Sequence, residues 1–130
     1  MYNILAVDDE PDILFLYKTI INLRGKYTLL DTASNGEEAV QKYKAYLSRK
    51  KVDLVIMDHR MPVMDGLKAT RKILAMDREA KIKFVSADLR VKKAALEAGA
   101  VDFVEKPLLV KALIRNIEEV LDSTGDNNMP

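Results

Sequence analysis

The chain has 130 residues, enough for one domain with a continuous core but not for two. Lys and Arg number 21 against 20 Asp and Glu, so the net charge gives no general attraction to nucleic acid or to an anionic membrane. The absence of Cys excludes disulfides and thiolate chemistry. No apolar stretch approaches the roughly 20 residues of a membrane span, and no secretory signal pattern is present. We therefore expect a cytoplasmic protein that neither inserts into a membrane nor binds nucleic acid.

Short apolar runs that predict strands alternate along the chain with 3.6-residue patterns that predict helices. In chain order, we expect a strand at Asn3–Val7, a helix over Ile13–Leu23, a strand at Tyr27–Ala33, a helix over Glu37–Ser48, a strand at Val52–Met57, a helix after Asp65-Gly66, a strand at Lys81–Val85, a helix over Leu89–Ala98, a strand at Asp102–Glu105 and a helix over Val110–Leu121. This alternation predicts an α/β fold, a parallel sheet with helices on both faces. We assign residues 1–122 to this domain and 123–130 to a polar tail.

Four of the predicted helices have an apolar face that should pack on the sheet. We expect these residues to point inward: Ile13, Leu16, Tyr17, Ile20 and Leu23; then Ala39, Val40, Tyr43 and Leu47; then Leu67, Thr70, Ile73 and Leu74; and last Val110, Leu113, Ile114, Ile117, Val120 and Leu121. The helix over Leu89–Ala98 offers mainly the small residues Ala94, Ala95 and Ala98, so it should be held by few contacts.

Polar side chains stand where four of the five predicted strands end. Asp8 and Asp9 follow the first strand, Asp58 the third, Ser86 the fourth and Lys106 the fifth. The carboxyl ends of parallel strands meet at one edge of a sheet, where such folds bind their ligands. We therefore expect three carboxylates, a hydroxyl and an ammonium group to lie together there.

This set of groups predicts metal-assisted phosphoryl transfer. Clustered carboxylates repel one another unless a cation lies among them, and oxygen ligands suit a hard cation such as Mg²⁺. The metal and Lys106 would neutralise phosphoryl oxygens, Ser86 could donate a hydrogen bond to one of them, and a carboxylate could accept the group. A cis peptide between Lys106 and Pro107 would turn the chain and aim the lysine.

The same motifs resemble those of response-regulator receiver domains of two-component systems. They are Asp8-Asp9, the run D-L-V-I-M-D-H-R-M-P-V-M-D-G over Asp53–Gly66, Ser86-Ala87 and Lys106-Pro107, in a resemblance that covers about residues 3–122. It implies a flavodoxin-like, doubly wound three-layer sandwich with strand order 2-1-3-4-5. It implies Asp58 as phosphoacceptor, with Lys106 and Ser86 contacting the phosphoryl group. It also implies an Mg²⁺ (or Mn²⁺) ion held by Asp8, Asp9, Asp58 and the backbone carbonyl of Arg60.

The resemblance also implies a signalling switch and its partners. The hydroxyl of Ser86 and the ring of Phe103 would move together on phosphorylation and reorganise the surface of the fourth helix, fifth strand and fifth helix. A sensor histidine kinase or phosphotransfer protein would supply the phosphoryl group, docking near the first helix. Because little chain follows the fifth helix, we expect output through a downstream protein target, through a further phosphotransfer or through a domain outside this sequence, and the sequence does not choose among these. We expect a monomer or a weak homodimer through the switch surface, and no catalysis beyond the chain's own phosphorylation and dephosphorylation.

Three residues near the acceptor depart from the common family pattern. His59 follows Asp58 where an apolar or aromatic residue is usual, and we interpret it as a partly exposed neighbour, neither a proton shuttle nor a metal ligand. Arg60 and Asp88 stand two residues past Asp58 and Ser86. We hypothesise that they pair across the mouth of the site and slow loss of the phosphoryl group.

Three other functions remain open on the sequence alone. A haloacid-dehalogenase-type phosphatase would use similar groups, but its nucleophile ends the first strand. A flavin- or nucleotide-binding scaffold would need a Gly/Ser/Thr-rich loop after the first strand, where this chain has Asp8-Asp9-Glu10-Pro11. A receiver scaffold that no longer takes phosphate would act through protein contacts only.

Overall fold

The computed structural model describes residues 1–106, 115 and 117–121. Its elements are β1 (Tyr2–Val7), α1 (Pro11–Asn22), β2 (Tyr27–Ala33), α2 (Gly36–Tyr46), β3 (Leu54–Asp58), α3 (Gly66–Met76), β4 (Ile82–Ser86), a 3₁₀ turn η1 (Leu89–Val91), α4 (Lys92–Ala98) and β5 (Asp102–Glu105). Residues 117–121 are also helical. The strands pair in parallel in the order β2-β1-β3-β4-β5, which confirms the predicted fold class and strand order.

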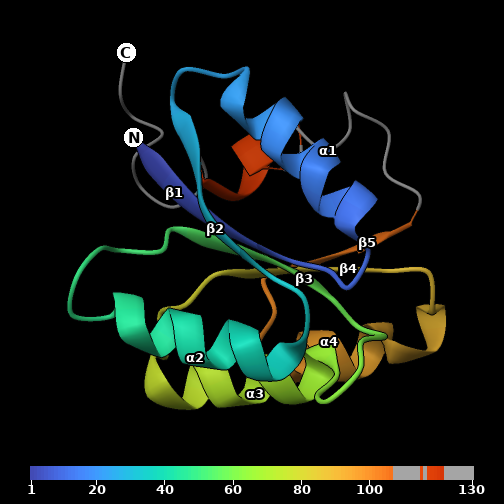
Figure 1. The fold of residues 1–130 in the computed structure, drawn as a ribbon. Coiled ribbons are helices and arrows are strands. Elements are labelled where there is room, and N and C mark those ends of the chain that lie inside the picture. Colours follow the sequence, from blue (N-terminus) through green and yellow to red (C-terminus); the bar gives the residue numbers. More distant parts are fainter. Residues whose placement is uncertain (107–114, 116, 122–130) are drawn as a thin grey trace.

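The molecule has three layers, with the sheet in the middle (Figure 1). The helix α1 and residues 117–121 cover one face, while α2, α3 and α4 cover the other. A hydrophobic core lies on each face of the sheet, and alternate residues of the central strands point into one or the other. Ile4 and Ala6 face α1, whereas Leu5 and Val7 face α2 and α3. Burial of both faces explains the nearly continuous apolar run of β1 and β3. Among the described residues, no helix is long and apolar enough to cross a membrane.

Local signals set where several helices begin and end. The side chain of Asn35 accepts a hydrogen bond from the backbone N–H of Glu38 at the start of α2, and Asp65 accepts one from Lys68 at the start of α3. At the end of α4, Gly99 takes a left-handed conformation with φ of 113°. The predicted fourth helix is divided, because its first three residues form the turn η1.

Most of the expected inward residues are buried, but three leucines are not. Leu16 is 38% exposed, Leu23 76% and Leu47 49%, so the prediction was wrong for these positions. Leu23 and Leu47 are the C-terminal cap residues of α1 and α2, where the chain leaves the sheet. The buried stripe of α1 runs through Ile21 instead of Leu16, together with Tyr17 and Ile20.

The described residues include only some of those predicted to form the last helix. Ile117, Val120 and Leu121 are buried against α1 and the sheet, as predicted. Val110, Leu113 and Ile114, the peptide before Pro107 and the tail over residues 123–130 lie outside the described residues.

The strands β4 and β5 are joined on both faces of the sheet. On the face toward α1, Lys83 is fully buried and its ammonium lies 2.5 Å from Asp102. On the other face, Phe84 stacks on Phe103, with ring centroids 5.9 Å apart. The two pairs are adjacent in the strand register. An ion pair and an aromatic pair therefore hold the edge strand β5 to the sheet.

Candidate functional site

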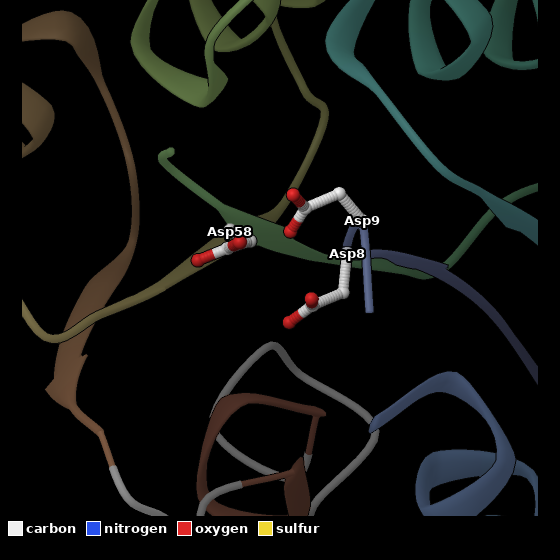
Figure 2. A group of neighbouring side chains, drawn as sticks. All are labelled: Asp8, Asp9 and Asp58. Carbon is white, nitrogen blue, oxygen red and sulfur yellow. The ribbon is translucent and has the colours of Figure 1, made fainter. Parts of the chain in front are cut away.

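Three carboxylates meet at the carboxyl edge of the sheet, where the sequence places them. Asp8 and Asp9 follow the end of β1, and Asp58 is the last residue of β3. Figure 2 shows the three side chains gathered beside these two neighbouring strands, and they offer oxygens that all lie within 4.8 Å of one another. Asp8 and Asp58 are buried, while Asp9 is exposed. The cluster is therefore half open to solvent, as a site for an incoming ligand must be.

The donor set fits a hard divalent cation. Oxygen-only ligands close together, one of them exposed, are what Mg²⁺ accepts while keeping several waters. Asp8 also accepts a hydrogen bond from the backbone N–H of Glu10 at 3.0 Å, which fixes its orientation. The three carboxylates could hold a metal ion. The backbone carbonyl of Arg60 as a further ligand stays a prediction.

Lys106 turns into the carboxylate cluster. Its Nζ atom lies 2.8 Å from Oδ2 of Asp8 and 3.1 Å from Oδ1 of Asp58. Burial alone would lower the pKa of Lys106, but its hydrogen bond to Asp8 and the charge of Asp58 raise the pKa on balance. The ammonium group is therefore charged at neutral pH and close enough to the acceptor to contact a group carried on it.

The negative charge of the Asp58 carboxylate is disfavoured by its surroundings. Burial raises the pKa of its carboxyl group above the ordinary value, and the nearby charge of Asp8 raises it further, while Lys106 offsets part of this effect. A cation bound at this carboxylate would reduce its repulsion with Asp8. Such a perturbed carboxylate in a cleft is a candidate reactive group.

Ser86 and Arg60 line the same cleft, which has a volume of about 490 Å³ and also includes Asp58 and Lys106. The buried Oγ atom of Ser86 accepts a hydrogen bond from the backbone N–H of Asp88, so its own proton remains available for a ligand. Every described residue predicted to contact the phosphoryl group thus lies at one site.

The predicted pair at the mouth of this cleft is present. Arg60 lies 3.2 Å from Oδ2 of Asp88. Arg90, which sequence reasoning missed, binds the same carboxylate through two of its nitrogens, at 2.9 and 3.1 Å. The bonds from Arg90 and Arg60 hold the pKa of Asp88 well below its usual range. The turn η1 brings Arg90 back beside Asp88, and sequence spacing alone does not show this.

Two further residues shape the site without having been predicted to do so. A Cβ atom at Gly66 would lie 1.8 Å from the backbone oxygen of Asp58, so only glycine lets α3 begin this close to the acceptor. Tyr17 is buried in α1, and burial followed by the charges of Asp8 and Asp58 raises the pKa of its hydroxyl. The dipeptide Asp65-Gly66 at the start of α3 is typical of a turn, but it does not predict that Gly66 contacts Asp58.

His59 and Phe103 lie to either side of Phe84. His59 is partly buried, and Phe103 is partly buried in β5. The His59 ring centroid is 5.7 Å from that of Phe84. His59 is thus a partly exposed neighbour of Asp58, and its lack of a role as proton shuttle or metal ligand stays a prediction.

Comparison with known proteins gives consistent matches over nearly the whole chain. The family model described as the response regulator receiver domain matches residues 4–118. The chemotaxis protein CheY of Treponema pallidum is 42% identical over 123 residues, which cover 92% of this chain and 83% of that protein.

Two solved structures are similar in both fold and sequence. CheY from Borrelia burgdorferi, in a complex with CheX, BeF₃ and Mg²⁺, is 33% identical with a TM-score of 0.84, and the match covers 92% of this chain and 88% of that one. The response regulator TrrA from Thermotoga maritima, in complex with Mg²⁺ and BeF, is 34% identical with a TM-score of 0.81 and coverage of 93% and 100%.

Proposed function

Because the chain belongs to the response regulator receiver domain family and acts as a phosphorylation-activated switch of two-component signalling, we propose that its phosphoacceptor is Asp58. The observation that carries this proposal is the contact of Lys106 with both Asp58 and Asp8 at the open acidic cluster. We propose a sensor histidine kinase or phosphotransfer protein as the donor and a protein as the downstream target.

In the proposed reaction, an oxygen of the Asp58 carboxylate forms a new bond to phosphorus. The bond between phosphorus and the donor's imidazole nitrogen breaks, and its electron pair stays on that nitrogen. Mg²⁺ at Asp8, Asp9 and Asp58 would supply charge neutralisation, as Mn²⁺ could in its place. Lys106 would bind a phosphoryl oxygen through its ammonium group, and Ser86 would donate its hydroxyl proton to another.

The test of this proposal uses a small phosphodonor. The protein is incubated with Mg²⁺ and acetyl phosphate, and its intact mass is measured for the wild type, Asp58→Ala and the control Asp65→Asn. We expect the mass to rise by one phosphoryl group in the wild type and the control only. A gain in Asp58→Ala as well would move the acceptor elsewhere. No gain in the wild type would favour the scaffold that acts through protein contacts alone.

We further propose that the chain catalyses only its own phosphorylation and dephosphorylation. Support comes from the position of the perturbed carboxylate at the end of β3, since the alternative phosphatase needs its nucleophile after the first strand. Hydrolysis of p-nitrophenyl phosphate should therefore stay at background. Mg²⁺-dependent turnover that Asp8→Asn abolishes would support a phosphatase instead.

The pair at the mouth of the cleft is proposed to lengthen the life of the phosphorylated state. Arg60 and Arg90 both bind Asp88, so the three side chains form a polar bridge beside the path of water to Asp58. We expect Arg60→Asn to speed loss of the phosphoryl group, followed by intact mass over time. An unchanged rate would show that the bridge does not restrict water.

A further inference from the structure

Three aromatic rings form a row that leads from the residue after Asp58 to the edge strand β5. The rings of His59 and Phe84 are 5.7 Å apart at their centroids with an interplanar angle of 41°, and those of Phe84 and Phe103 are 5.9 Å apart at 16°. The three residues come from the end of β3, from β4 and from β5, which are neighbours in the sheet. The row therefore runs from the residue after Asp58, across β4, to the edge strand β5.

The position of the His59 ring is set by packing. Its Nδ1 atom is buried without a hydrogen-bond partner, so no polar contact at that atom orients the imidazole. The ring it packs on belongs to a fully buried residue, Phe84. A buried ring in a close-packed core cannot move far without leaving a cavity. The Phe84 ring therefore keeps a fixed position between the rings of His59 and Phe103.

The third ring is at the less constrained end of the row. Phe103 is only partly buried and lies in the edge strand, next to the short helix α4. Its stacking partner among the described residues is Phe84. Offset stacked ring pairs stabilise their arrangement beyond simple burial. The orientation of Phe103 thus depends on where Phe84 lies, and Phe84 is in contact with His59 on its other side.

We propose that His59 is a positioning residue that holds the Phe103 ring in its inward orientation through Phe84. It thereby couples the segment that follows Asp58 to β5, in parallel with any movement of Ser86. This inference rests on the proposed function of Asp58, because the coupling has a signal to carry only if that residue is modified. The coupling requires a ring at position 59 and does not depend on the protonation of that ring.

The test compares variants that keep or remove the ring. His59→Phe keeps an aromatic ring, and His59→Leu replaces it with an aliphatic side chain. The protein has three phenylalanines, so incorporation of 4-fluorophenylalanine gives three ¹⁹F signals in the wild type and in His59→Leu. His59→Phe gives a fourth signal, which is identified by its absence from the wild type. Phe15→Leu and Phe103→Leu assign them. The signal of Phe15, which is 70% exposed, marks the exposed ring, and that of Phe84 reports whether the core is intact.

In the free protein, we expect the Phe103 signal of His59→Phe to match the wild type. His59→Leu should move it toward the Phe15 value, with a population of the outward ring about two- to tenfold higher, the effect of losing the tilted aromatic pair of His59 and Phe84. With Mg²⁺ and BeF₃⁻ bound, His59→Leu should still keep a larger population of the outward Phe103 ring than the wild type, because the pair with Phe84 is missing in both states.

An unchanged Phe103 signal of His59→Leu in both states would overturn the inference, as would a His59→Phe protein that behaves like His59→Leu. If the Phe84 signal shows that His59→Leu has lost its core, His59→Met, whose flexible side chain fills the space without a ring, decides the question in its place. A wild type that does not respond to BeF₃⁻ contradicts the proposed function alone, since the signals of the free proteins still test the role of the ring.

Discussion

Replacement of Lys106 by Met should destabilise the protein by leaving two buried carboxylates without their cation. The ammonium lies 2.8 Å from Asp8 and 3.1 Å from Asp58, and the Asp8 side chain is 1% exposed. Loss of one partner of a buried ion pair costs about 3–5 kcal/mol. The Lys106 side chain is 22% exposed, so solvent screening lowers the expected loss to about 2–3 kcal/mol.

The pH dependence of this loss has a definite sign. The folded pKa of Asp58 is raised, so its charged form opposes folding, and the opposition disappears as pH falls through that pKa. The cost of Lys106→Met should therefore shrink in acid. It should also shrink when Mg²⁺ is added. The folded pKa of Lys106 is raised too, so the stability it contributes in the wild type should be present at neutral pH and fade only as pH rises through that alkaline value.

The assay is urea unfolding followed by circular dichroism, with EDTA or with Mg²⁺, at neutral pH and at about pH 4. Lys92→Met, an exposed lysine on α4, is the control and should change stability by less than about 0.5 kcal/mol. A loss in Lys106→Met no greater than in this control, or a larger loss that neither acid nor Mg²⁺ reduces, would refute the electrostatic reasoning.

Three further predictions concern the site and the β4–β5 pair. Gly66→Ala should slow phosphorylation by acetyl phosphate at least about tenfold and lower stability by about 2 kcal/mol or more, because its Cβ would collide with the backbone oxygen of Asp58; a wild-type rate would contradict this. Asp102→Asn should cost about 1–3 kcal/mol in urea unfolding, because it leaves the buried ammonium of Lys83 without its partner while solvent screens the carboxylate, which is 41% exposed, and Lys83→Met should cost less; the reverse order would contradict a buried ammonium that depends on Asp102. Mg²⁺ at ten times its dissociation constant should stabilise the wild type by about 1.4 kcal/mol in thermal unfolding, but not Asp8→Asn; equal stabilisation of both would place the metal elsewhere.

The features that follow from chain order could be predicted from the sequence. Alternating patterns specify parallel strands, and parallel strands bring their carboxyl ends together, so Asp8, Asp58 and Lys106 could be placed at one edge before any coordinates were known. Errors arose at helix ends such as Leu23 and Leu47, where an apolar residue continues the periodic pattern after the helix has turned away from the core.

Contacts that depend on side-chain reach could not be predicted in the same way. Lys83 lies in an otherwise apolar run, and only the register of β4 with β5 shows that Asp102 meets its ammonium. Arg90 reaches Asp88 because a 3₁₀ turn intervenes, and the aromatic row needs rings from three strands. Each depends on how elements pack, which local pattern does not encode.

The most direct test of the central claim is to locate the phosphoryl group on the chain. The protein is treated with Mg²⁺ and acetyl phosphate, reduced with borohydride to convert an acyl phosphate into an alcohol, digested, and sequenced by tandem mass spectrometry. We expect a single reduced residue at Asp58 and none when Mg²⁺ is replaced by EDTA. Reduction at Asp8 or Asp9 instead, or a phosphate ester on Ser86, would contradict it.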